Sequence, residues 1–275
     1  MSRLPLAPVL ALVLAIPPAA PAGTELPDAG ELLARVIGAL PDIPLLIEGD
    51  LQAKDRNGTV ESRQNVEMLL DWQDTPPTAR YTLRDAFGGA RSHLAITWPA
   101  GQPAEFRYFE GQPLQAAPLP DLVANIGGTD ISWMDLSLSF LWWPGAKTVG
   151  AEEVRGRTCY VMDVPAPADA FPGCTGVRLW IEPRIGIMLR AEAYDAQNDL
   201  MRRMEVKSFK KINDRWVIKD IELTSLPSRH KTHLRVRDVQ DRSRKDFIAT
   251  DEGGPEAPAE APPEDVDTVQ PGPVE

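Results

Sequence analysis

The chain has 275 residues, a hydrophobic content of 43% and a formal net charge of −11 at pH 7. This length allows one large domain or two small ones, and the hydrophobic content can support a sizeable core. Residues 251–275 hold eight acidic residues and no basic one, so the rest is only mildly acidic, and the basic cluster near Arg229–Lys245 indicates a solvated strand face rather than a nucleic-acid-binding surface.

The two ends of the chain are typical of export and of disorder. Arg3, the short apolar run Val9–Ile16 and the small residues before position 22 predict a signal peptide over residues 1–22, cleaved after Ala22. The apolar run is shorter than the roughly 20 residues that cross a bilayer, although an uncleaved anchor is the alternative. Residues 249–275 are acidic and proline-rich, which predicts a disordered tail. We therefore expect a soluble periplasmic protein without a transmembrane segment in the mature chain.

Between these ends, the pattern predicts one domain over residues 26–248, made mainly of antiparallel strands. Leu32, Leu33, Val36 and Leu40 recur at helical spacing after a possible cap at Asp28. Alternating or β-branched runs between turn signals then predict strands at 45–54, 64–72, 80–84, 93–98, 104–109, 158–164, 177–182, 187–194, 200–211, 215–225 and 230–241. This regular spacing favours a single curved sheet or incomplete barrel whose concave face is covered by helices and retains an apolar hollow.

The segment Asp130–Trp143, which we call the lid segment, is apolar on all sides. It predicts a short buried helix, capped by Thr129 or Asp130 and stopped by Pro144-Gly145. A strand over Leu136–Leu141, where Leu and Ser alternate, is the alternative. We expect this segment to lie across the concave face as a movable lid, with an immobile core plug as the other interpretation.

The aromatic residues supply the candidates for a lipid-binding surface. Most tryptophans of a protein serve core packing, but Trp142 and Trp143 are adjacent, so one of them is expected at a rim. The candidate residues for the cavity and its lid are Leu70, Trp72, Trp98, Trp133, Leu138, Phe140, Leu141, Trp142, Trp143 and Trp180.

The remaining chemistry is sparse. Cys159 and Cys174 are the two cysteines, and in an exported chain they favour a disulfide, with two free thiols as the alternative. His230 and His233 are three residues apart and would face opposite sides of a strand, which does not favour a metal site. No nucleophile, phosphate-binding or zinc motif occurs, so the sequence predicts neither an enzyme nor a cofactor.

Several motifs together resemble a known family. They are Gly-Gly-Thr-Asp at 127–130, Gly-x-x-Cys-Tyr-Val at 156–161, Trp-Ile-Glu-Pro at 180–183 and Arg-Ala-Glu-Ala-Tyr-Asp at 190–195. With the first helix and the up-and-down sheet, they make residues 28–241 similar to a divergent branch of the LolA-like periplasmic outer-membrane lipoprotein-sorting proteins.

The resemblance implies a half-barrel that holds lipoprotein acyl chains, or another lipid, and passes them between inner- and outer-membrane transport proteins. Well-known members hold the lid with an arginine inside the sheet, and the sequence alone assigns no arginine to that role. A related sensor family uses the same fold, so a self-filled half-barrel that serves as a sensory or structural protein-interaction module is the alternative function.

Overall fold

The computed structural model describes residues 26–167, 169, 171–212 and 215–242, with side chains given outside 212–216. The predicted signal peptide and acidic tail lie outside these residues. Two helices, α1 (Ala29–Gly38) and α2 (Trp133–Ser137), and a 3-10 helix, η1 (Ser139–Trp142), accompany thirteen strands. The strands are β1 (Leu45–Lys54), β2 (Val60–Asp71), β3 (Thr78–Arg84), β4 (Ala90–Thr97), β5 (Glu105–Glu110), β6 (Gln115–Ala117), β7 (Lys147–Val154), β8 (Arg157–Pro165), β9 (Gly176–Glu182), β10 (Ile187–Tyr194), β11 (Leu200–Ile212), β12 (Arg215–Ser225) and β13 (Lys231–Asp241).

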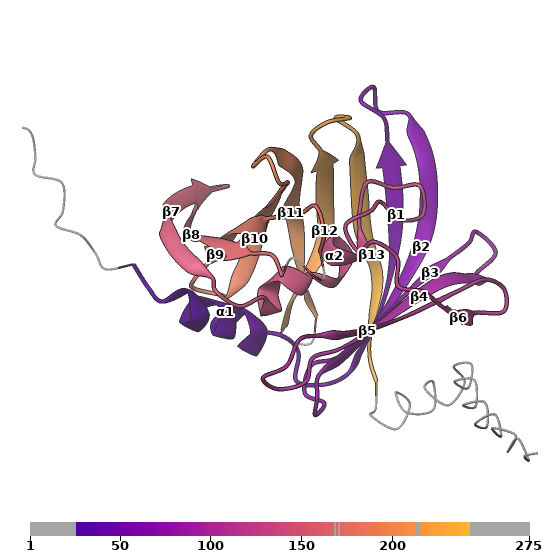
Figure 1. Ribbon diagram of the computed structural model, residues 1–275, viewed down its shortest axis with the longest axis horizontal. Helices are drawn as coiled ribbons and strands as arrows, with labels where there is room; N and C mark the ends of the chain where they lie inside the picture. The colour runs from indigo at the N-terminus through magenta and orange to yellow at the C-terminus, as the bar shows by residue number, and fades with distance from the viewer. Residues whose placement is uncertain (1–25, 168, 170, 213–214, 243–275) are drawn as a thin grey trace, which may run out of the picture.

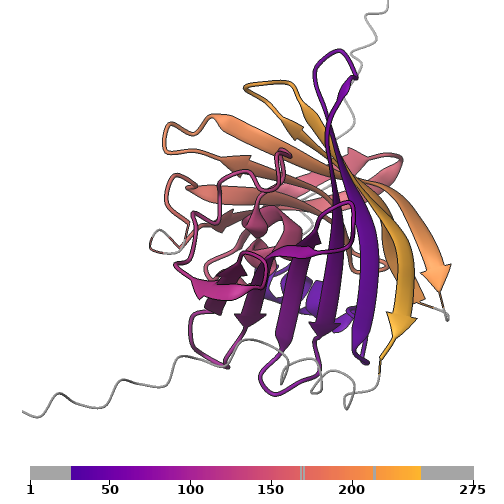
Figure 2. The ribbon, with the colours of Figure 1, turned by 90° about the vertical axis from the view of Figure 1, so that its right-hand side faces the viewer.

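All thirteen strands form one antiparallel sheet in the order β6-β5-β4-β3-β2-β1-β13-β12-β11-β10-β9-β8-β7. Strands that follow one another in the chain pair in the sheet, except β6 and β7, and β1 pairs with β13, which joins the first and last strands in the middle of the sheet. β6 and β7 are therefore the two edges, and the chain that connects them has to pass from one edge of the sheet to the other. This connection, residues 118–146, contains the lid segment and lies within the curve of the sheet (Figures 1 and 2).

The inner face of the sheet is set by alternation of side chains. In β1, Leu45, Ile47, Gly49, Leu51 and Ala53 are buried, while the residues that alternate with them are half-exposed, as the sequence predicted. α1 begins after Asp28, whose carboxylate accepts a hydrogen bond from the Glu31 N–H, and it turns its apolar side toward the same core. The prediction of a curved, open sheet with helices on its concave face is confirmed.

A second, smaller apolar cluster lies on the opposite face of the sheet. It consists of Val154, Cys159, Val161, Trp180 and Leu189. Because side chains alternate across a strand, these residues point away from Met162 and Val164 of β8 and Leu179 of β9, which belong to the main core. Arg155, in the turn between β7 and β8, donates to the Val206 and Lys207 carbonyls of β11 and so links this turn to β11.

Candidate functional site

The lid segment is a short helix followed by a turn of 3-10 helix. α2 is capped by Ser132, whose hydroxyl oxygen accepts from the Asp135 N–H while the Asp135 carboxylate accepts from the Ser132 N–H at 3.0 Å. The predicted buried helix is confirmed, but the predicted cap at Thr129 or Asp130 is wrong. The Thr129 hydroxyl donates to the Ile126 carbonyl, and Asp130 bonds to Thr232, so it is Ser132 that closes the first turn. Leu138 then takes a left-handed conformation (φ 52°), which ends α2 and redirects the chain into η1.

The lid segment presents its large side chains to the inner face of the sheet. Trp133, Phe140, Leu141 and Trp143 are buried in the main core, and Leu138 and Trp142 are half-buried against it. Of the predicted lining residues of the sheet, Leu70 and Trp98 are buried in this core and Trp72 packs at its margin. Nine of the ten candidates are thus brought together in or against the main core.

The two adjacent tryptophans separate as the sequence predicts. Trp142 stacks on Trp98 with ring centroids 4.6 Å apart and on Trp72 at 5.1 Å, so it joins the end of the lid segment to the ends of β2 and β4. Trp143 is 6% exposed and packs on Phe171 at 4.6 Å and against the edge of Phe140. Trp142 therefore lies at the rim and Trp143 in the interior.

Trp180 is the exception among the candidates. It lies in the small cluster on the outer face, where its indole N–H donates to Glu152 at 2.9 Å and Arg190 sits over its ring. Strand β9 turns its neighbours Leu179 and Ile181 inward, so Trp180 has to point outward. Its assignment to the cavity was wrong.

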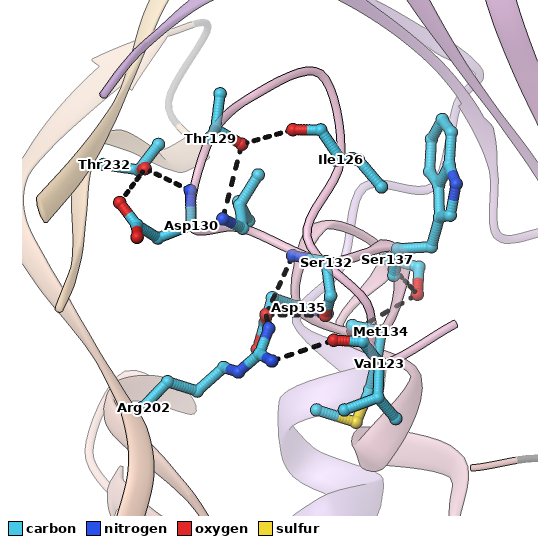
Figure 3. Close-up of polar contacts among 12 residues, drawn as sticks. Val123, Ile126, Thr129, Asp130, Ser132, Met134, Asp135, Ser137, Arg202 and Thr232 are labelled. Carbon is cyan, nitrogen blue, oxygen red and sulfur yellow. Dashed lines mark hydrogen bonds and ion pairs between the residues drawn. The ribbon is translucent and has the colours of Figure 1, made fainter. Parts of the chain in front are cut away.

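A buried arginine on the inner face of the sheet holds the lid segment. Arg202, in β11, forms an ion pair with Asp135 at 2.6 Å and donates to the Val123 carbonyl at 2.8 Å (Figure 3). The side chains of Arg202 and Asp135 are 11% and 4% exposed. One guanidinium therefore binds both the helix of the lid segment and the loop before it, in a place where water cannot replace either partner.

Arg202 was not predicted from the sequence, although the pattern of β11 contains a signal. Arg202, Met204 and Val206 occupy alternate positions, and all three are buried. An arginine at an inward position of an apolar alternation requires an acceptor inside the protein. The acceptor, Asp135, is 67 positions away in the sequence, so the pairing could not be inferred without the fold.

Two further strands, β13 and β2, hold the first residue of the lid segment and the loop before it. The Thr232 hydroxyl of β13 accepts from the Asp130 N–H at 2.8 Å and donates to the Asp130 carboxylate at 3.0 Å (Figure 3). Ser62 and Gln64 of β2 both donate to the Gly127 carbonyl at 2.9 Å. The lid segment and the loop before it are thus attached by polar contacts to β2, β11 and β13 and by apolar contacts to the rest of the concave face.

The concave face is filled by the chain itself where a hollow was expected. The largest of the fully buried side chains include Trp133, Phe140 and Met134 of the lid segment, together with Phe171. A pocket of about 410 Å³ lies to one side, between β2–β5 and residues 120–127. The lid segment therefore fills the space within the curve of the sheet.

The two cysteines are free thiols in the structure, which corrects the predicted disulfide. Cys159 belongs to the outer-face cluster and Cys174 to the main core, so the sheet lies between the environments of the two sulfur atoms. Burial raises the pKa of Cys159 to about 11, with the nearby Glu182 carboxylate acting in the same direction. A thiol with a raised pKa is a poor nucleophile at neutral pH.

We expect both cysteines to label with iodoacetamide only after the protein is unfolded, and to do so without reductant. Burial limits access in the folded protein, and the raised pKa keeps Cys159 protonated at pH 8. Intact mass after labelling in buffer, in urea, and in urea with reductant checks this. Labelling that depends on reductant would show a disulfide and contradict the structure.

Other classes of site receive no support from the described residues. No three or more His, Cys, Asp or Glu side chains within this part of the chain are grouped so that they could hold a metal ion. Among the same residues, no helix is long and apolar enough to span a membrane. The geometry is that of an apolar, covered half-barrel.

Comparisons with known proteins agree on the fold. A family model described only as an uncharacterized protein matches residues 120–247, which is less than half of the chain. A domain described as outer membrane lipoprotein-sorting, from Vibrio parahaemolyticus, has a TM-score of 0.67 at 12% identity and covers 80% of this chain and 96% of its own. A LolA superfamily protein from Nitrosomonas europaea has a TM-score of 0.63 at 15% identity, covering 81% and 97%.

A DUF1329 family protein from Desulfovibrio piger is similar to the same degree, with a TM-score of 0.65 at 13% identity and coverage of 77% and 91%. The comparison with curated proteins finds no match. These likenesses extend over most of the solved chains, and at such low identity they establish the shared half-barrel fold.

Proposed function

We propose that this chain, whose fold is LolA-like, is a non-enzymatic periplasmic carrier that binds the acyl chains of a lipoprotein or another lipid beneath its lid segment. The observation that carries the proposal is the attachment of the lid segment. An apolar concave face is covered by a segment that packs on it through large apolar side chains and whose polar attachment is limited to the Arg202–Asp135 ion pair and a few hydrogen bonds. Such a cover can be displaced as a unit, because its polar contacts are confined to a few positions.

The energetics of the concave face favour a fatty chain as the exchange partner of the lid segment. Burial of each methylene group contributes about 0.8 kcal/mol. The bound chain has to replace the contacts of Trp142, Phe140 and Leu141 with the sheet, so the net affinity is the difference between two large apolar terms. The closed structure then corresponds to the empty carrier, and cargo binding requires the lid segment to move.

The periplasm is the proposed location, and transport proteins of the inner and outer membranes are the proposed partners. Two of the solved structures with this fold are described as a lipoprotein-sorting domain and a LolA superfamily protein, which supports this assignment. The predicted signal peptide at residues 1–22 is consistent with it.

The second candidate is a sensory or structural interaction module with a permanently filled half-barrel. It is favoured by the burial of Trp133 and Phe140, 2% and 1% exposed, in the position expected for cargo. On this alternative the lid segment is an immobile plug, and a protein partner binds the outer surface or the acidic tail.

Native mass spectrometry of the full chain purified from a periplasm tests the carrier proposal. We expect a co-purified lipid, or uptake of a fluorescent fatty-acyl probe from vesicles, that requires the lid segment to move. A variant that tethers the lid segment, with Thr232 and Asp130 both replaced by cysteine and oxidised, is expected to block uptake, and reduction to restore it. A folded protein that neither retains nor exchanges lipid would leave the interaction module as the function; capture of a protein partner that depends on residues 251–275 would support it.

A further inference from the structure

The pocket of about 410 Å³ beside the lid segment has an apolar floor and a polar rim. Leu83 and Trp133 belong to its buried lining, and Trp133 also contributes to the main core. Its remaining walls come from β2, β4 and β5 on one side and from residues 120–127 on the other. A pocket of this size accommodates a small polar group with a few attached carbon atoms.

Arg91 is the basic residue of this pocket, and a β-bulge directs it there. Ala90 lies opposite Arg84 and Ser92 opposite Leu83, so Arg91 is the extra residue of β4. A bulge turns a side chain away from the direction that simple alternation would give. The Arg91 side chain is 65% exposed, and its ion pair with Asp85 is long, at 3.7 Å. Asp85 is also held by Gln112 and by backbone N–H groups, so Arg91 can turn to an anion in the pocket.

Two carboxylates lie near Arg91: Asp121 in the lining of the pocket and Glu110 beside it, opposite the lining residue Ser92 in the β4–β5 pair. Asp121 lines the pocket and accepts a hydrogen bond from the Val123 N–H at 2.9 Å, which leaves its second oxygen for a ligand. Glu110 accepts from the hydroxyl of the lining residue Tyr108 at 3.3 Å. One guanidinium and two carboxylates around an apolar floor match a group that carries both a negative and a positive charge.

We propose that this pocket binds the zwitterionic phosphodiester headgroup of an amphiphile, with its phosphate on Arg91 and its ammonium group near Asp121 and Glu110. The inference rests on the proposed carrier function, because it supplies the polar end of the ligand whose acyl chains lie under the lid segment. Trp133 separates the pocket from the main core, so the chains attached to this headgroup pass beside its indole. One wall of the pocket, residues 120–127, is the loop before the lid segment. A ligand in the pocket therefore also holds that loop in place.

Calorimetric titration of the full chain with short-chain lipids below their micelle concentration tests the pocket. The probes are dihexanoyl phosphatidylethanolamine, dihexanoyl phosphatidylglycerol, dihexanoylglycerol and phosphoethanolamine alone. We expect the ethanolamine lipid to bind about tenfold more tightly than the phosphatidylglycerol, which lacks the ammonium group, and the phosphatidylglycerol to bind more tightly than dihexanoylglycerol, which also lacks the phosphate. Arg91→Gln should weaken both phospholipids about equally, because both carry the phosphate, and leave dihexanoylglycerol binding unchanged.

The control is Arg107→Gln, the same change at an exposed arginine of β5 outside the pocket lining, which should leave all affinities unchanged. Asp121→Asn keeps the oxygen that caps Val123 and should weaken only the ethanolamine lipid. Equal binding of the three lipids, or an Arg91→Gln variant that binds both phospholipids as tightly as the wild type, would overturn the headgroup site while leaving the carrier function in place. Binding of phosphoethanolamine alone, without any lipid, would instead support the pocket and contradict the carrier function.

Discussion

Replacing Arg202 by methionine is expected to lower the free energy of unfolding by about 3–5 kcal/mol. Removing one partner of a buried ion pair leaves the other charge without compensation. Asp135, whose side chain is 4% exposed, would keep only its bonds to Ser132, and the Val123 carbonyl would lose its donor. Urea denaturation followed by circular dichroism measures the loss as a lower midpoint at an unchanged slope.

Two variants make this result specific. Arg178→Met breaks an ion pair of the same length, 2.6 Å, between side chains that are 39% and 47% exposed, and should cost about 1 kcal/mol or less. Arg202→Met combined with Asp135→Asn removes the stranded charge while keeping an acceptor for the cap, so it should recover part of the stability. If Arg202→Met costs no more than Arg178→Met, the buried pair does not hold the lid segment.

Much of the sheet could be predicted because one-sided burial leaves a period of two in the sequence. The bounds of β1, β10 and β12 agree with the prediction, and most other strands differ by a few residues. β6 and β7 were missed because an edge strand pairs on one side only and needs few apolar residues; β7 has a single buried residue, Val154. Because neither edge strand was predicted, it could not be predicted that β6 and β7 lie at opposite edges of the sheet. The crossing of the lid segment between those edges could not be predicted for the same reason.

The features of the candidate site that follow from composition could be predicted from the sequence. Those that depend on which face of the sheet a residue occupies, and on which residues it meets there, could not. The lid segment could be predicted because it is apolar on all sides. The adjacent positions of Trp142 and Trp143 indicated that one of them lies at a rim and the other in the interior. By contrast, Trp180 was assigned to the wrong face because β9 is apolar on both faces, with Leu179 inward and Trp180 outward in separate clusters. The disulfide prediction failed for the same reason, since two cysteines close in sequence lie on different faces.

Trp142→Ala is expected to change lipid exchange more than stability, and Trp143→Ala to do the reverse. Trp143 is 6% exposed, and truncating a buried tryptophan costs roughly 3–5 kcal/mol. Trp142 is half-buried and contributes mainly its stacking on Trp72 and Trp98, for which each aromatic pair adds about 0.5–1.5 kcal/mol beyond area burial. We therefore expect a loss of about 1–3 kcal/mol for Trp142→Ala, with faster uptake of an acyl probe because the end of the lid segment is released.

Trp180→Ala is the control that distinguishes an effect on the lid segment from an effect on overall stability. Trp180 is 4% exposed and lies in the outer-face cluster, so its truncation should destabilise the protein about as much as Trp143→Ala. It does not contact the lid segment, and probe uptake per folded molecule should stay at the wild-type rate. Uptake measured at a temperature where all variants are folded makes the comparison direct. If Trp142→Ala leaves uptake unchanged while it destabilises as strongly as Trp143→Ala, residues 130–143 act as an immobile plug, since a movable cover has to respond when its rim contact is removed.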